Sequence, residues 1–288
     1  MNIQWYPGHM TKAVPAMKEE IKLIDLLIEL VDARAPLSSR NPDIDELGKG
    51  KARLILMNKW DLADEKAGEK WDEYFRGKGY CTVHLDSRSR GSVRQVNAAV
   101  QEACREKIER DRRRGILNRP VRAMVVGIPN VGKSTFINSF AGRACAKTGN
   151  KPGVTKGNQW IRLSKTLELL DTPGILWPKF EDQQAGIRLA FLGSINDDIL
   201  NKEELALELI AFLDRDYPGC LKARYGEELE SGTPIQVLEQ IARIRACLKK
   251  GGEYDYGRAA NLVLDDFRSG KLGKITLEIA RASCRERV

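Results

Sequence analysis

The sequence predicts an α/β fold, in which helices lie on both faces of a mostly parallel sheet, followed by a smaller all-helical domain. Two observations lead to this prediction. Short apolar runs of strand length alternate with helical patterns through the first part of the chain, as in strand–helix–strand units. From about Gln183 only helical patterns remain. We therefore expect domains at residues 1–180 and 181–280, with 281–288 as a non-native or disordered tail.

The composition narrows the class of protein. The 288 residues are 42% hydrophobic and 31% charged, and no apolar run approaches the roughly 20 residues that span a bilayer. The six cysteines lie far apart, without the close spacing of a zinc site or a disulfide framework. These features favour a cytoplasmic protein in a reducing compartment, and we expect it to be monomeric and to bind no membrane.

The net charge of +8 is unevenly distributed along the chain. Residues 181–288 carry 16 Lys+Arg against 19 Asp+Glu, which leaves an excess of +11 in residues 1–180. A positive field attracts polyanions such as nucleic acid, although scattered lysines are also ordinary solubilising surface. A basic partner surface, if there is one, is therefore expected in the first domain.

The chain begins with a helical pattern over Met10–Lys22, where apolar residues recur at spacings of three and four. The apolar run Leu26–Val31 then predicts a buried strand that leads into a loop rich in Pro, Ser and Asn. Asp32-Ala-Arg34 follows this strand directly. Three interpretations of Arg34 stay open: an arginine finger, a structural ion pair and an RNA contact.

A second short strand, Arg53–Met57, is followed by Asn58-Lys59-Trp60-Asp61. This matches NKxD, the guanine-reading motif of GTPases. The carboxylate of Asp61 can accept hydrogen bonds from the ring N–H and the exocyclic amino group of guanine, which adenine cannot offer in that arrangement. The aliphatic stem of Lys59 can lie over the base, and Asn58 can tie neighbouring loops together.

A helix over Asp64–Gly77 and a strand over Tyr80–Leu85 are expected next. The strand ends at Asp86-Ser87-Arg88-Ser89, where GTPases carry a loop whose backbone supports the guanine oxygen. Only Ser87 fits that loop well, so the match is partial.

One helix is expected over Ser92–Arg114, with a basic end from Arg105 onward. Cations near a helix C-terminus interact favourably with the helix dipole and are usually solvated. Contact with RNA phosphates is the second interpretation of this basic end.

The run Gly127-Ile-Pro-Asn-Val-Gly-Lys-Ser-Thr135 reads GxxxxGKS between an apolar strand and a helix expected over Ser134–Phe140. This pattern predicts a phosphate-binding P-loop. Its glycines let backbone N–H groups turn toward phosphate oxygens, Lys133 adds a mobile positive charge, and the Ser134 hydroxyl can bind Mg²⁺. The positive end of the following helix dipole supports the same anion.

The segment after the P-loop contains Thr155, the candidate switch threonine, and then two alternating strands at Asn158–Leu163 and Leu167–Leu170. The second strand ends in Asp171-Thr-Pro-Gly174, a DxPG pattern. Asp171 can hold Mg²⁺ through water, and the Gly174 N–H can sense the γ-phosphate, so that this loop has two states.

These motifs define the candidate site. The nucleotide-binding candidates are Asn58, Lys59, Asp61, Ser87, Asn130, Val131, Gly132, Lys133, Ser134, Thr135 and Gly174. The metal candidates are Ser134, Thr155 and Asp171, and the catalytic candidates are His9, Lys133 and Thr155.

The order of the motifs is unusual, because NKxD precedes the P-loop, whereas in most small GTPases it follows. The chain therefore predicts a circularly permuted P-loop GTPase domain, which is feasible because chain ends can be moved among surface loops. With Trp5–Met10, Asp32–Pro36, Pro152–Thr155 and the motifs above, the sequence closely resembles the ribosome biogenesis GTPase A (YlqF-type) family. The resemblance implies GTP hydrolysis coupled to late assembly of the large ribosomal subunit, with its precursor and rRNA as partners.

Hydrolysis has a weak point at Ile175, which stands where Ras-like enzymes place a water-orienting Gln. An isoleucine cannot hydrogen-bond water, so intrinsic hydrolysis should be slow and stimulated by the ribosome. Our candidate replacement is His9, one of two histidines, although a local packing role for it is equally open. Asn130 resembles the P-loop asparagine of K⁺-dependent GTPases, which adds K⁺ to Mg²⁺ as a candidate cofactor.

The second domain is expected to hold four helices, at Ala185–Leu192, Lys202–Leu213, Pro234–Leu248 and Tyr256–Phe267. The resemblance implies that this domain binds RNA or ribosomal protein. Two functions therefore compete: a GTPase switch, and a nucleotide-gated RNA-binding module in which hydrolysis is incidental.

Overall fold

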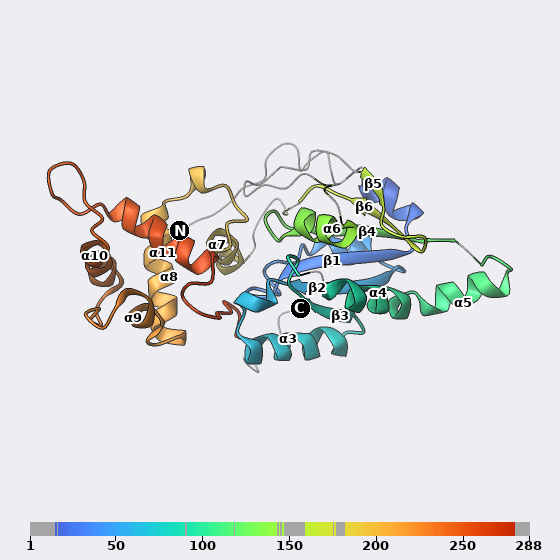
Figure 1. Cartoon of the computed structure of the whole chain (residues 1–288), viewed down its shortest axis with the longest axis horizontal. Coiled ribbons are helices and arrows are strands. Elements are labelled where there is room, and N and C mark those ends of the chain that lie inside the picture. The colour runs from blue at the N-terminus through green and yellow to red at the C-terminus, as the bar shows by residue number, and fades with distance from the viewer. Residues whose placement is uncertain are drawn as a thin grey trace. The chain divides into compact units, whose positions relative to one another are not determined.

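The computed structural model describes residues 15, 17–89, 91–117, 119–142, 144, 146, 159–174, 176 and 182–279. Contacts within the chain divide these residues into two compact units, an α/β unit and a helical unit over Asp182–Ile275 (Figure 1). Residues 276–279 belong to the α/β unit. This differs from the expected boundary, because Thr276, Leu277 and Glu278 hydrogen-bond to α/β residues rather than extend the helical unit.

The α/β unit is built on a six-stranded sheet with the order β3-β2-β1-β4-β6-β5. Every neighbouring pair is parallel except β5 and β6, which are antiparallel. The mostly parallel sheet that the sequence predicts is thus confirmed. Its strands are β1 (Leu26–Asp32), β2 (Ala52–Asn58), β3 (Cys81–Leu85), β4 (Val121–Gly127), β5 (Gln159–Arg162) and β6 (Leu167–Asp171).

Strand β1 lies in the interior of the sheet, and all seven of its residues are buried. From β1 the chain adds β2 and β3 on one side, whereas β4 and β6 extend the sheet on the other. The order of strands therefore reverses between β1 and β4. In open α/β sheets, ligands bind at such a reversal, outside the carboxyl ends of the strands.

Helices and short 3₁₀ turns connect the strands of the α/β unit. Asp64 begins α3 by accepting a hydrogen bond from the Ala67 N–H at 3.0 Å. Trp71 and Phe75 of α3 pack on Val31 and Met57 of the sheet. The elements are η1 (Ile21–Leu23), α2 (Asp43–Leu47), η2 (Trp60–Leu62), α3 (Glu65–Gly77), α4 (Ser92–Ala103), α5 (Arg105–Arg113) and α6 (Lys133–Ala141).

The single helix expected over Ser92–Arg114 is wrong, because the structure has two helices that meet at Cys104. Cys104 leaves helical geometry, with φ −103° and ψ 11°, and is itself buried. Burial explains the break: α4 keeps Val96 and Val100 in the core, whereas the only buried residue of α5 is Asp111. Of the helix expected over Met10–Lys22, the described residues 15 and 17–20 are helical.

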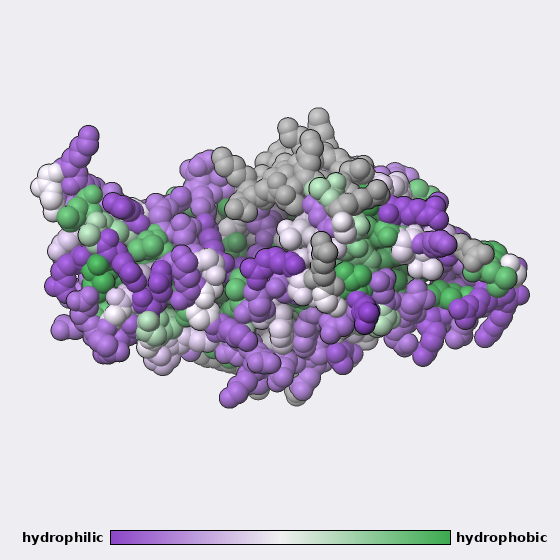
Figure 2. Space-filling model, viewed as in Figure 1, coloured by the Kyte–Doolittle hydropathy of each residue, from purple (hydrophilic) through white to green (hydrophobic). Residues whose placement is uncertain are grey.

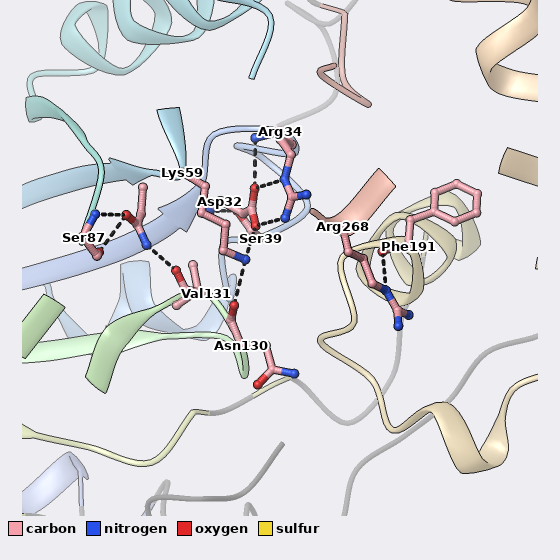
Figure 3. A network of polar contacts seen from close by, with 10 residues as sticks. Asp32, Arg34, Ser39, Lys59, Ser87, Asn130, Val131, Phe191 and Arg268 are labelled. Carbon is pink, nitrogen blue, oxygen red and sulfur yellow. Dashed lines mark hydrogen bonds and ion pairs between the residues drawn. The ribbon is translucent and has the colours of Figure 1, made fainter. Parts of the chain in front are cut away.

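The helical unit packs the buried face of α8 against α10 and α11. Its elements are α7 (Gln183–Phe191), η3 (Asp197–Ile199), α8 (Lys202–Asp216), α9 (Cys220–Tyr225), α10 (Pro234–Ile244) and α11 (Tyr256–Arg268). The four expected helices are present, and the six-residue α9 is an addition, because a segment this short has no readable periodicity. Arg268 links two elements by donating to the Phe191 carbonyl at 3.0 Å (Figure 3).

Figure 2 shows hydrophilic residues over most of the visible face, which agrees with the 31% of charged residues in the chain. None of the described helices is both long and apolar enough to cross a membrane.

Candidate nucleotide-binding site

The candidate site forms where the parallel strands end. Asp32, Asn58, Gly127 and Asp171 are the last residues of β1, β2, β4 and β6. Because these strands are parallel, their carboxyl ends lie at one edge of the sheet. The sheet therefore gathers motifs that are up to 139 positions apart, counted from Asp32 to Asp171.

The P-loop turns sharply just before α6. Asn130 and Gly132 have positive φ values of 58° and 98°, in the left-handed region, just before α6 begins at Lys133. A Cβ atom on Gly132 would lie 2.4 Å from Asn58 Nδ2. The close approach of Asn58, the first residue of the guanine motif (residues 58–61), therefore excludes a larger residue at position 132. The N–H groups at the start of α6 provide the partial positive charge that suits a phosphate.

Asn58 joins the guanine motif to two other loops. Its Nδ2 donates to the Val131 carbonyl in the P-loop at 2.6 Å, and its Oδ1 accepts from the Ser87 N–H at 3.0 Å and the Ser87 hydroxyl at 2.7 Å. The prediction that Asn58 ties neighbouring loops together is confirmed. The same bonds bring Ser87 to the site, although its loop matches the expected motif only in part.

Lys59 makes the second link between the guanine motif and the P-loop (Figure 3). Its Nζ donates to Asp32 Oδ2 and to the Asn130 carbonyl, both at 2.8 Å. Burial lowers the pKa of Lys59 from its usual value, and the Asp32 carboxylate opposes that shift. Lys59 itself has a left-handed backbone, with φ 58°, which turns its side chain at the end of β2.

Asp32 is the centre of this charge network, although the sequence did not mark it as a site residue. Burial by itself would raise the pKa of Asp32, but Arg34 and Lys59 together hold it well below its usual range. Arg34 donates to Asp32 through Nε and Nη2, both at 2.9 Å, and is only 2% exposed. Of the three interpretations of Arg34, the structure therefore supports the structural ion pair. The sequence signal that could have marked Asp32 as a site residue is its position as a carboxylate at the end of a buried strand.

Asp61 has one oxygen in an ion pair and one without a partner. Its Oδ2 accepts from Arg88 Nη2, and Arg88 also contacts Asp86. The buried Asp61 Oδ1 has no hydrogen-bond partner among the described residues. A buried acceptor of this kind suits an N–H donor on a bound base.

Lys133 and Asp171 face each other at the phosphate end of the site. Lys133 Nζ lies 3.4 Å from Asp171 Oδ1, and both side chains are buried. Burial lowers the pKa of Lys133 and raises the pKa of Asp171, while each partly offsets the shift of the other. An anionic phosphate beside Lys133, or a cation beside Asp171, favours the charged form of its neighbour.

The oxygen donors near this pair fit Mg²⁺. Ser134 is half-buried in the first turn of α6, one residue after Lys133, and the carboxylate of Asp171 approaches from β6. Magnesium takes oxygen ligands, typically a few from protein, and completes its shell with water and phosphate oxygens. When bound, it would neutralise charge on the phosphate oxygens.

Gly174 is in close contact with the P-loop. A Cβ atom there would lie 2.9 Å from the Pro129 nitrogen, so the DxPG segment and the P-loop touch through backbone atoms. Thr172 anchors the same segment by donating to the Val125 carbonyl at 2.8 Å. The candidates His9 and Thr155, and also Ile175, lie outside the described residues.

A P-loop after β4, a guanine motif after β2 and a DxPG segment after β6 define a P-loop GTPase. The guanine motif precedes the P-loop along the chain, so this GTPase domain is circularly permuted.

Comparison with known proteins supports this class. A family model described as "50S ribosome-binding GTPase" matches residues 122–232. The ribosome biogenesis GTPase A of Bacillus cereus is 48% identical over 278 residues, which cover 96% of this chain and 94% of that protein. The protein of that name from Thermotoga maritima is 32% identical over 278 residues, covering 96% and 94%. The chain thus belongs to the ribosome biogenesis GTPase A family, and it is a GTPase.

Solved structures agree with this assignment. The crystal structure of GNP-bound YlqF from T. maritima has a TM-score of 0.66 and 28% identity, covering 93% of this chain and 97% of that one. A GDP-bound structure of the T. maritima protein gives a TM-score of 0.66 at 27% identity, covering 91% and 98%.

Proposed function

We propose that the chain binds and hydrolyses GTP at the edge described above as a switch in late assembly of the large ribosomal subunit. The proposal is carried by two hydrogen bonds that join the guanine motif to the P-loop. Asn58 bonds to the Val131 carbonyl and Lys59 to the Asn130 carbonyl, so base-reading and phosphate-holding loops form one unit. This arrangement suits a nucleotide that contacts both loops at once.

In this proposal each motif contacts a different part of GTP. Asp61 accepts from the guanine edge, the Lys59 stem covers the base, and Ser87 supports the guanine oxygen. The amides of Asn130–Thr135 and the Lys133 ammonium hold the phosphates, and the Gly174 N–H contacts the γ-phosphate. Ser134, Asp171 and Thr155 hold Mg²⁺, and K⁺ is a second candidate cation beside Asn130.

The hydrolytic step depends on orienting a water molecule. Ile175 cannot hydrogen-bond that water, so the isolated protein is expected to turn over slowly. We propose that His9 supplies this group when the protein is bound to its ribosomal partner. In its neutral form an imidazole can accept a proton from water, which makes histidine a suitable residue for the role.

The names of the relatives support the choice of partner. Three Bacillus proteins, one from Priestia megaterium and the T. maritima protein carry the name ribosome biogenesis GTPase A, and the family model is described as ribosome-binding. The proposed partners are therefore a precursor of the large subunit and its rRNA. We place this function in the cytoplasm and propose a monomer.

Single-turnover hydrolysis of radiolabelled GTP, with and without large-subunit particles, tests the proposal. Particles should raise the rate of hydrolysis at least about tenfold, and His9→Ala should lower the stimulated rate about 100-fold while GDP affinity stays unchanged. Equal rates with and without particles would instead favour an RNA-binding module in which hydrolysis is incidental. An unchanged stimulated rate in His9→Ala would remove His9 from the mechanism.

The role of K⁺ is tested separately by measuring hydrolysis in matched NaCl and KCl. A faster rate in KCl is expected, and equal rates would remove K⁺ from the proposal.

A further inference from the structure

Three residues after the helical unit, Thr276–Glu278, form a buried segment that we call the C-terminal strap. Thr276 is 0% exposed, Leu277 4% and Glu278 5%. The Asp64 N–H donates to the Thr276 hydroxyl at 3.0 Å, and Trp71 Nε1 donates to the Glu278 carbonyl at 2.7 Å. The strap is thus held against the start of α3, within the α/β unit.

The strap also binds the loop that follows β1, residues 33–40, which we call the β1 loop. The Glu278 carboxylate accepts from the Leu37 N–H at 2.6 Å and the Ser38 N–H at 2.8 Å, and from the Ser38 hydroxyl. The Leu277 N–H donates to the Arg34 carbonyl at 2.6 Å. A carboxylate that accepts from consecutive N–H groups fixes their orientation, because such charge-assisted bonds are short and strong.

The β1 loop in turn holds Asp32. The Ser39 hydroxyl accepts from the Asp32 N–H at 2.9 Å, and the Ala35 N–H donates to the Asp32 carbonyl at 2.9 Å. Arg34 contacts the Asp32 carboxylate through its side chain (Figure 3). Asp32 is therefore hydrogen-bonded to the β1 loop through its N–H, its carbonyl and its carboxylate, and this is the loop that the strap binds.

Asp32 places Lys59, which reaches the P-loop. The Lys59 ammonium donates one hydrogen bond to Asp32 Oδ2 and another to the Asn130 carbonyl, each at 2.8 Å. A continuous series of buried or half-buried hydrogen bonds thus runs from Glu278 through the β1 loop, Asp32 and Lys59 to the phosphate loop.

We infer that Glu278 is a positioning residue for nucleotide binding, which acts on Lys59 through the β1 loop and Asp32 without touching the nucleotide. The inference rests on the proposed GTP site. Its consequence is that guanine-nucleotide affinity depends on a residue at the far end of the chain, 240 positions from its partner Ser38.

The test measures the Kd of fluorescent GDP for the full chain, well below the unfolding temperature. Glu278→Gln keeps the shape of the side chain but turns an amide toward the Leu37 and Ser38 N–H groups, and should raise Kd about tenfold. Asp32→Asn should also raise Kd. If Glu278 acts through Asp32, adding Glu278→Gln to Asp32→Asn should raise Kd no further.

A stability effect alone is excluded by a matched control. Asp266→Asn alters a carboxylate of the helical unit that is 0% exposed and bonded to Arg224. It should lower the unfolding temperature and leave the Kd for GDP unchanged. If Glu278→Gln does not fold, Ser38→Ala replaces it and should raise Kd about threefold, again only when Asp32 is present.

The inference is overturned if Glu278→Gln or Ser38→Ala lowers the unfolding temperature without changing Kd, or if either effect multiplies with that of Asp32→Asn. Failure of the proposed guanine-nucleotide site, on which the inference rests, gives a different result, because the unaltered chain then shows no GDP binding at all.

Discussion

At the scale of single residues, the guanine motif is defined by how its three polar side chains are used. Asn58 and Lys59 use their hydrogen bonds within the protein. Asn58 bonds to Ser87 and the P-loop, and Lys59 bonds to Asp32 and the P-loop. Asp61 Oδ1 has no partner in the described part of the chain. Of the three, Asp61 is therefore the one that we propose as the reader of the base.

Replacing Asp61 with Asn should change the preferred base of the bound nucleotide from guanine to xanthine. An amide offers one donor and one acceptor, and xanthine presents a carbonyl where guanine presents an amino group. GTP affinity should fall about 10- to 100-fold, since a mismatched buried polar pair costs about 1–3 kcal/mol, while XTP binding should be gained. Competition against fluorescent GDP measures both.

Asp86→Asn is the matched control for Asp61→Asn. Asp86 is the other carboxylate that Arg88 contacts, and it lies outside the guanine motif. Its substitution should change GTP affinity by less than about twofold, because exposed ion pairs contribute little. Unchanged GTP affinity in Asp61→Asn would contradict the assignment of Asp61.

At the scale of elements, β1 organises the α/β unit. It pairs with β2 and β4, ends at Asp32, and carries a second carboxylate, Glu29, among apolar residues. Glu29 is 1% exposed and accepts from Arg40 at 3.0 Å and from Arg53 at 3.2 Å. Both arginines also contact the half-exposed Asp45, so a small charge cluster covers one side of β1.

Glu29→Gln should lower the free energy of unfolding by about 3 kcal/mol. Removing one charge of a buried cluster leaves its partners without full compensation, which costs more than an exposed pair contributes. Asp45→Asn, in the same cluster but with a side chain 48% exposed, should cost less than about 1 kcal/mol. Urea unfolding of the two variants provides the comparison, and equal losses would show that burial does not decide the effect.

At the scale of the whole molecule, positive charge is concentrated in the first 180 residues, where α5 is the most basic of the described helices. Arg112 and Arg114, in and just after α5, are exposed. The helical unit also carries cations, including exposed Lys249 and Lys250, but its net charge is not positive. An RNA partner drawn by charge should therefore bind the α/β unit through α5.

Neutralising Arg112 and Arg114 with Gln should weaken rRNA binding and make it less dependent on salt. Each phosphate contact contributes about 0.7–0.9 to the slope of log K against log salt, so the slope should fall by about 1.5. Lys249→Gln with Lys250→Gln removes the same charge elsewhere and should leave the slope unchanged. Fluorescence anisotropy across a salt series measures both, and an equal loss in the two double variants would refute a role specific to α5.

Much of the fold was predictable because its signals are local. Apolar runs and alternating patterns located the six described strands, the reversal of motif order predicted the permuted domain, and apolar periodicity located four helices of the helical unit. The errors came from tertiary packing: Cys104 breaks the helix expected over Ser92–Arg114, and Thr276–Glu278 return to the α/β unit.

By itself, the sequence determined which chemistry the site contains, because the P-loop, NKxD and DxPG motifs are short and their residues are neighbours in the chain. Only the tertiary structure decided what holds them in place. Asp32 and Glu278 act through hydrogen bonds to loops, and the bond from Glu278 to Ser38 spans 240 positions. Such a contact has no periodicity and no fixed spacing, so it becomes readable only once the parallel strands have brought their ends together.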